Sequence, residues 1–152
     1  MGMLCLDLRA AFDTLWHPGL LHKLFVMGFP PFLLRFVRSF LAGRRFCIKI
    51  NGVRSAPRPI VGGVPQSPVV SPTLFNCYLH DVPHLPGVDI AEFADDTVLI
   101  SASHRTCTIH KRLQGASNSY VRYFRKWKVH VNDVKSEANL FTRQADTVPL
   151  FL

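Results

Sequence analysis

The sequence predicts an α+β protein, a sheet covered by helices, and three observations indicate this class. Short apolar stretches bounded by turn residues are interspersed with longer segments of helical period. The expected order is strand, helices, hairpin, helix, hairpin, helix and strand pair, which differs from the regular alternation of a parallel α/β fold. The 152 residues are 48% hydrophobic with a mean hydropathy of +0.16, which is enough for one domain with a core.

The first half of the chain is expected to form a strand, two helices and a hairpin. The strand is the apolar run MLCLDL at residues 3–8, and the first helix covers residues 19–28. The second helix covers residues 30–43 and has one broad apolar face, formed by Phe32, Leu33, Phe36, Val37, Phe40 and Leu41. Asn51-Gly52 indicates the turn of a hairpin over residues 44–57, because both residues tolerate positive φ.

The second half is expected to form a helix, a hairpin, a long helix and two final strands. Ser71 is the expected N-cap of the first of these helices, with Pro72 in its first turn. The hairpin covers residues 91–100, and the long helix covers roughly residues 105–128. Residues 128–141 indicate a strand, a turn at Asn132-Asp133 and a second strand.

Composition limits the class of protein and its partners. The net charge is +8 and the pI is about 9.8, which suits a polyanionic partner such as nucleic acid. The longest uncharged run lies between Arg58 and Asp81 and contains four prolines, so we expect no membrane span. We expect an intracellular protein of the nucleus or cytoplasm, not a secreted one, and interpret the four cysteines as reduced core thiols: Cys5, Cys47, Cys77 and Cys107.

Two adjacent aspartates, Asp95 and Asp96, interrupt the apolar stretch AEFADDTVLI. Ionised side chains are rarely buried unless they are paired or bind a metal. We expect this pair at the tip of a hairpin, with Asp7 close to Asp95 because Asp7 ends another apolar strand. Three clustered carboxylates suit Mg²⁺, and two such ions serve in-line phosphoryl transfer. The alternative is that the pair forms an exposed turn and that Asp7 is a helix cap.

Three segments in order, LDLRAAFD, GGVPQSPVVSPTLFNCYLHDVP and FADD, resemble the reverse transcriptase of non-LTR retrotransposons of the jockey-like or I-like kind. The resemblance covers nearly the whole chain. It implies the palm subdomain of a right-hand polymerase, with an antiparallel sheet covered by helices and some fingers helices. Residues 1–152 are then one partial domain, without the upstream fingers, the thumb or the endonuclease.

The resemblance implies a role for each residue that matches the family's motifs. Asp7 and Asp95 match the two metal-binding aspartates, and Asp96 matches a supporting carboxylate. Phe12 matches the aromatic residue beneath the incoming sugar, which leaves no room for a 2′-hydroxyl. Lys135 matches a lysine that helps to protonate the pyrophosphate leaving group. Judged without the family, Phe12 is a core aromatic residue and Lys135 a solvated surface residue.

The segment GGVPQSPVVSP resembles the family's Gly-x-Pro-Gln-Gly-Ser loop, in which the glutamine supports the template and the glycine admits the nucleotide. Gly63, Pro65 and Gln66 match this pattern. Ser67 stands where glycine is expected, and Pro68 stands where serine is expected. Proline removes an N–H and fixes φ, so these departures bear on nucleotide binding. An unstructured loop is the alternative.

The function implied by the resemblance is RNA-directed DNA polymerisation, a nucleotidyl transfer that uses two Mg²⁺ ions, or Mn²⁺ in their place. The implied partners are an RNA template, a DNA primer and deoxynucleoside triphosphates, whereas the oligomeric state is not predicted. Because parts of the enzyme are expected to be absent, the alternative is a catalytically inactive nucleic-acid-binding remnant. Basic side chains that either contact phosphates or form solvated faces are Arg44, Arg45, Arg54, Arg58, Arg122, Arg125, Lys126 and Lys128.

Overall fold

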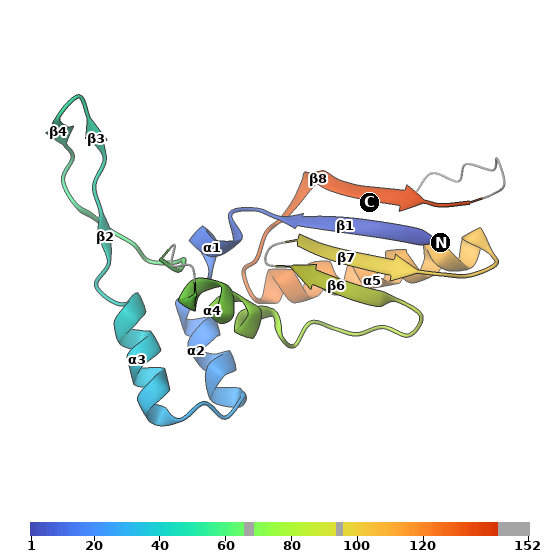
Figure 1. Cartoon of the computed structure of the whole chain (residues 1–152), viewed down its shortest axis with the longest axis horizontal. Coiled ribbons are helices and arrows are strands. Elements are labelled where there is room, and N and C mark those ends of the chain that lie inside the picture. The colour runs from blue at the N-terminus through green and yellow to red at the C-terminus, as the bar shows by residue number, and fades with distance from the viewer. Residues whose placement is uncertain (66–68, 94–95, 143–152) are drawn as a thin grey trace. The chain divides into compact units, whose positions relative to one another are not determined.

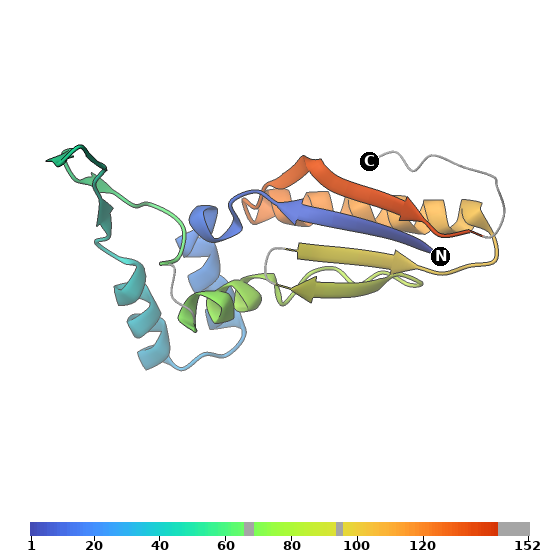
Figure 2. The same ribbon diagram turned by 45° about the horizontal axis from the view of Figure 1, so that its top comes forward.

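The computed structural model describes residues 1–65, 69–93 and 96–142 and divides the chain into two compact units. The first, called the sheet unit here, joins Met1–Ala11 to the residues from Asp81 onward. The second, called the ribbon unit, is Phe12–His80. Figure 1 labels the elements of both units, and Figure 2 shows them from a second direction.

The sheet unit contains a four-stranded antiparallel sheet in the order β6-β7-β1-β8. Its strands are β1 (Gly2–Leu8), β6 (Asp89–Phe93), β7 (Asp96–Ser101) and β8 (Val131–Leu140). The predicted hairpin over residues 91–100 is confirmed, because β6 pairs antiparallel with β7. The pairing runs from Asp89 opposite Ile100 to Phe93 opposite Asp96. Central strand β1 therefore lies between two strands that come from much later in the sequence.

Helix α5 (Thr106–Lys126) covers one face of this sheet, as both views show (Figures 1 and 2). Successive strand residues point to opposite faces, and the leucines Leu4, Leu6 and Leu8 alternate with less buried residues along β1. The core they form with the helix includes Ile109, Leu113, Ala116, Tyr120 and Phe124. The predicted long helix and the α+β class are both confirmed, and the opposite face of the sheet carries Asp7.

The prediction of two strands over residues 128–141 is wrong. Val131–Leu140 is one strand, β8, and both of its halves pair with β1. Asp7 pairs with Asn132 and Cys5 pairs with Glu137, so two steps along β1 correspond to five along β8. Asn132 and Asp133, the expected turn residues, therefore lie at a bulge within β8. Pairing along the whole of β1 forms in place of a local hairpin.

The ribbon unit consists of helices and a protruding β-ribbon (Figure 1). Its helices are α1 (Ala11–Thr14, which begins at the unit boundary), α2 (His17–Val26), α3 (Pro31–Leu41) and α4 (Val70–Leu79). The ribbon pairs β2 (Arg45–Phe46) with β5 (Arg58–Pro59) and β3 (Lys49–Ile50) with β4 (Val53–Arg54). The predicted turn is confirmed, since Asn51 and Gly52 have φ of 48° and 84°.

One expectation for the helices of this unit is wrong, whereas the predicted helix with an apolar face is confirmed as α3. Ser71 is not the N-cap of α4, because that helix begins at Val70 and the Ser71 hydroxyl donates to the Pro65 carbonyl. Only part of the apolar face of α3 is covered: Val37 is buried, whereas Phe32 and Phe36 are exposed. Helical period identifies residues that share a face, but it does not determine how much of that face is covered.

Two further sequence expectations concern membranes and cysteines. No helix in the described part of the chain is both long and apolar enough to span a membrane. The cysteines differ from the predicted core thiols, because Cys47 and Cys107 are exposed and Cys5 and Cys77 are half-buried. Cys47 lies in the ribbon, where short strands have no covering layer, and Cys107 lies on the solvent side of α5.

Candidate functional site

Two of the three predicted carboxylates lie opposite each other on the central strands of the sheet. Asp7 near the end of β1 is the register partner of Asp96 at the start of β7. Directly paired residues project from the same face, and their Cβ atoms are about 4.5–5.5 Å apart in such pairs. Asp7 is half-buried and Asp96 is exposed, and both lie on the face away from α5. Asp95 lies outside the described residues.

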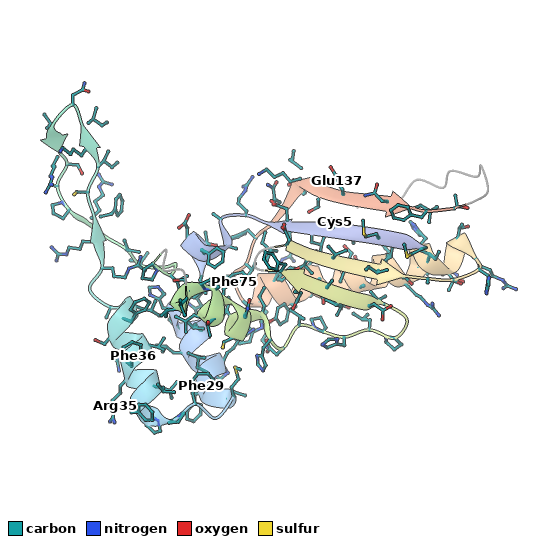
Figure 3. All side chains as sticks on the ribbon, viewed as in Figure 1. Cys5, Phe29, Arg35, Phe36, Phe75 and Glu137 are labelled. Carbon is teal, nitrogen blue, oxygen red and sulfur yellow. The ribbon has the colours of Figure 1, made fainter. Side chains whose placement is uncertain are left out.

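The same face carries a further acidic residue, and Cys5 reports on its electrostatics. Burial raises the pKa of the Cys5 thiol, and the carboxylates of Glu137 and Asp96 raise it further. Figure 3 labels Cys5 and Glu137 on adjacent strands, where the register pairs them. Cys5 and Asp7 are two residues apart on β1 and therefore share a face. The face beside Asp7 thus has negative potential.

The bulge of β8 lies beside Asp7 and contacts its backbone. The Asp7 amide donates to the Ser136 hydroxyl at 3.3 Å, and that hydroxyl donates to the Asn132 carbonyl at 2.8 Å. Ser136 is buried, whereas Lys135 is exposed within the same bulge. The structure therefore brings the strand segment that carries Lys135 next to the strand end that carries Asp7.

The oxygen ligands at Asp7 and Asp96 have the chemistry that Mg²⁺ requires, because carboxylates are hard donors. Two carboxylates held opposite each other repel, and a divalent cation would relieve that repulsion. With residues 66–68, 94–95 and 143–152 left aside, no group of three or more His, Cys, Asp or Glu side chains is close enough to hold a metal. The described pair fits a divalent ion as part of a larger ligand set.

The remaining predicted residues belong to the ribbon unit. The ring of half-buried Phe12 packs on the Phe75 ring with centroids 4.9 Å apart, and the Phe12 carbonyl accepts a hydrogen bond from the Val64 amide at 2.7 Å. Figure 3 labels Phe75 on α4. The carbonyl of half-buried Pro65 accepts a hydrogen bond from the Ser71 hydroxyl. Gln66 lies outside the described residues. The described part of the predicted nucleotide loop is therefore connected to Phe12 through Val64.

Gly63 fixes the path of this loop. Its φ is +75°, and a Cβ at this position would lie 2.5 Å from the Asp13 carbonyl oxygen. The Gly63 amide donates to the Leu15 carbonyl at 2.8 Å. The Gly63 carbonyl accepts hydrogen bonds from His17 Nε2 at 2.7 Å and from Arg44 at 3.0 Å. Both the backbone conformation and the close approach require glycine here.

Sequence reasoning did not anticipate the contacts that four residues make around these sites: Ser136, Glu137, His17 and Arg44. Ser136 contacts Asp7, and Glu137 lies opposite Cys5. Both contacts exist only because β8 pairs with β1, which is distant in the sequence. His17 and Arg44 both donate to the Gly63 carbonyl. Every residue has a backbone carbonyl, so the residue types in the sequence do not identify this acceptor. A signal for Ser136 existed in part, since a small polar residue interrupts the apolar pattern of the final strand.

Comparison with known proteins places this geometry in a family. The family model described as "Reverse transcriptase (RNA-dependent DNA polymerase)" matches residues 1–148. The RNA-directed DNA polymerase from mobile element jockey of Drosophila melanogaster is 35% identical over 95% of this chain. The probable RNA-directed DNA polymerase from transposon X-element of the same species is 32% identical over 96% of the chain. In both cases the chain spans only 16% of the relative's length.

A solved structure shows the same fold. Apo telomerase from Candida tropicalis, truncated from its C-terminal domain, superposes with a TM-score of 0.68 at 12% sequence identity. The match covers 95% of this chain and 31% of the telomerase chain. The family match over nearly all residues and the identity to the jockey polymerase lead to one conclusion: this chain belongs to the reverse transcriptase (RNA-dependent DNA polymerase) family.

Proposed function

We propose that this chain is the palm of an RNA-directed DNA polymerase and adds deoxynucleotides to a primer by a two-metal mechanism. The observation that carries the proposal is the pairing of Asp7 with Asp96 on the open face of the sheet. The expected partners are an RNA template, a DNA primer and deoxynucleoside triphosphates, in an intracellular setting. The wider division into a palm with adjoining fingers helices belongs to the same proposal.

The carboxylates of Asp7, Asp95 and Asp96 would hold Mg²⁺, for which Mn²⁺ could substitute. When bound, a pair of divalent ions activates the attacking hydroxyl and neutralises charge on the triphosphate. In the reaction, the primer 3′-oxygen forms a bond to the α-phosphorus, and the bond between that phosphorus and the leaving pyrophosphate breaks. Lys135 would supply a proton to the pyrophosphate, and its place in the bulge next to Asp7 supports that role.

Nucleotide selection would depend on the ribbon unit. Phe12 would lie beneath the sugar and exclude a 2′-hydroxyl, and its packing against Phe75 would keep the ring in position. Gly63 would let the backbone approach the nucleotide, next to Pro65 and Gln66, which would support the template. The two donors on the Gly63 carbonyl, His17 and Arg44, would hold this loop in place.

The test is extension of a DNA primer on an RNA template with Mg²⁺ and deoxynucleotides. Wild-type protein should extend the primer, and Asp7→Asn should abolish extension. Asp89→Asn is the matched control, because Asp89 is exposed at the opposite end of the same hairpin and pairs with Ile100. Loss of extension in both variants would contradict the assignment of Asp7.

A second function, a catalytically inactive nucleic-acid-binding remnant, is favoured by Ser67 and Pro68, which replace the expected glycine and serine. In that case wild-type protein and Asp7→Asn would bind a primed RNA template equally well, and neither would extend it. Binding by titration and extension on the same template therefore separate the two functions.

A further inference from the structure

The positive charge of the protein is concentrated in one of its two units. Residues 12–80 carry eight lysines and arginines against a single acid, Asp13. The other unit carries ten lysines and arginines against nine acids. Between Asp13 and Asp81 the sequence contains no acidic residue. Nearly the whole excess of +8 therefore belongs to the ribbon unit.

Within that unit, the β-ribbon presents its charges without cover. Every residue from Arg45 to Pro59 is exposed. Both views show the ribbon extending away from the helices of its own unit (Figures 1 and 2). It carries four exposed basic side chains: Arg45, Lys49, Arg54 and Arg58. In extended backbone, the four residue steps from Arg45 to Lys49 separate their Cα atoms by about 13 Å.

The two faces of the ribbon differ in chemistry. Lys49 and Arg54 are register partners, so their side chains project from one face. Ile50 and Val53 are also partners and project from the other face, where both are exposed. Ile48, the residue before β3, is also exposed.

The pairing of Lys49 with Arg54 is unfavourable in the isolated protein. Like charges directly opposite each other on neighbouring strands repel and destabilise the pair. A ribbon that keeps such a pair, with one acid in its whole unit, is complementary to an external polyanion. A row of charges along an extended ribbon suits a continuous polyanion better than a single anion.

We propose that the basic face of this ribbon binds the sugar–phosphate backbone of single-stranded RNA. A single strand is favoured over a duplex, because the A-form major groove is too deep and narrow for side chains to enter. Phe46 is exposed and shares a face with its register partner Arg58, so an unpaired base beside that arginine has a ring on which it can stack. Only the statement that this RNA is the template strand rests on the proposed function.

The experiment measures binding of an oligouridine RNA to the full chain over a series of salt concentrations. Each phosphate contact to a single strand contributes about 0.7 to the slope of log K against log salt. The double variant Lys49→Gln/Arg54→Gln should therefore reduce the slope by about 1.4. The matched control is Arg105→Gln/Lys111→Gln, which removes two exposed charges from the sheet unit and should leave the slope nearly unchanged.

Three outcomes would overturn the proposal: an unchanged slope in the ribbon variant, an equal decrease in the control, or a decrease seen with an RNA·DNA hybrid and absent with oligouridine. Polyglutamate that binds the wild type as tightly as the RNA would also overturn it. Loss of the fold is controlled by circular dichroism, and removal of a repulsive pair should not lower stability. Binding is measured without nucleotides in the Asp7→Asn background, so a failure of primer extension does not affect the result.

Discussion

Asp7 lies directly opposite Asp96 on the two central strands of the sheet, so two like charges share one face at adjacent positions. Cross-strand pairs of this kind change stability by about 0.2–1 kcal/mol, and like charges destabilise. An arrangement that costs stability in the free protein indicates selection for something other than folding. The proposed role as metal ligands accounts for it.

The first prediction is that Asp7→Asn and Asp96→Asn each raise the free energy of unfolding by about 0.2–1 kcal/mol in metal-free buffer. Each variant removes one of the two repelling carboxylates. Mg²⁺ at about a hundred times its Kd should stabilise the wild type by about 2.7 kcal/mol and the variants less. Urea denaturation with and without Mg²⁺ checks both effects. Equal stabilisation of all three proteins by Mg²⁺ would show that the ion binds elsewhere.

The second prediction concerns the Ser136 hydroxyl, which accepts a hydrogen bond from the Asp7 amide. Ser136→Ala removes this acceptor and also the donor to Asn132, so we expect a loss of about 1–2 kcal/mol in unfolding free energy. Ser136→Thr keeps the hydroxyl and should restore part of the loss. Ser39→Ala on the exposed side of α3 is the control and should have little effect. A Ser136→Ala variant as stable as wild type would mean that the bulge is held by its backbone alone.

The third prediction separates backbone strain from steric clash at Gly63. Gly63 and Gly28 have φ of +75° and +79°, but only Gly63 lacks space for a Cβ, whereas nothing lies within 4 Å at Gly28. Gly28→Ala should cost about 1 kcal/mol from φ alone. Gly63→Ala should cost at least 1–3 kcal/mol more, because the Asp13 carbonyl must move. Thermal unfolding of the two variants gives the comparison, and equal losses would rule out the clash.

The fourth prediction uses Cys5 as a reporter of the acidic face. Its pKa is raised from 9.0 by burial, Glu137 and Asp96, so the folded chain retains the thiol proton where the unfolded chain loses it. The resulting stabilisation is present below pH 9.0 and declines as the pH rises toward the higher pKa of the folded state. Alkylation of Cys5 by iodoacetamide across alkaline pH, followed by peptide mass spectrometry, measures that pKa.

In the same assay Glu137→Gln should shift the Cys5 profile to lower pH, because one negative neighbour is removed. Mg²⁺ bound beside Asp96 should shift it in the same direction. Exposed Cys47, in the other unit, serves as an internal control whose profile should change in neither case. A Glu137→Gln profile identical to wild type would show that burial alone sets the reactivity of Cys5.

Local signals in the sequence predicted what local physics decides. Asn51-Gly52 predicted the ribbon turn, since few residue pairs tolerate its positive φ angles. Asp7 was expected close to Asp95 because Asp7 ends an apolar strand. The register pairs Asp7 with the neighbouring Asp96, whereas Asp95 lies outside the described residues. The same reasoning failed for Asn132, where a genuine turn signal became a bulge once a longer partner strand was available.

Features that depend on distant pairing or on coverage could not be predicted. The hydrogen bond between the Asp7 amide and Ser136 joins residues 129 positions apart, so no local pattern identifies Asp7 as the partner of Ser136. Phe32 and Phe36 share the predicted apolar face of α3 but are exposed. The helical period shows which residues share a face, but not whether another element packs against that face. Ser71 has the composition of a cap, but the Pro65 carbonyl competes for its hydroxyl.

The position of β1 has a consequence for biosynthesis. Gly2 pairs with Ser101 on one side and with Leu140 on the other. A nascent chain therefore keeps both edges of β1 unpaired until β7 and β8 have been synthesised. Folds governed by such distant contacts form slowly, and unpaired strand edges attract aggregation during the delay. Chaperone dependence during synthesis follows from placing β1 between two strands that come from much later in the sequence.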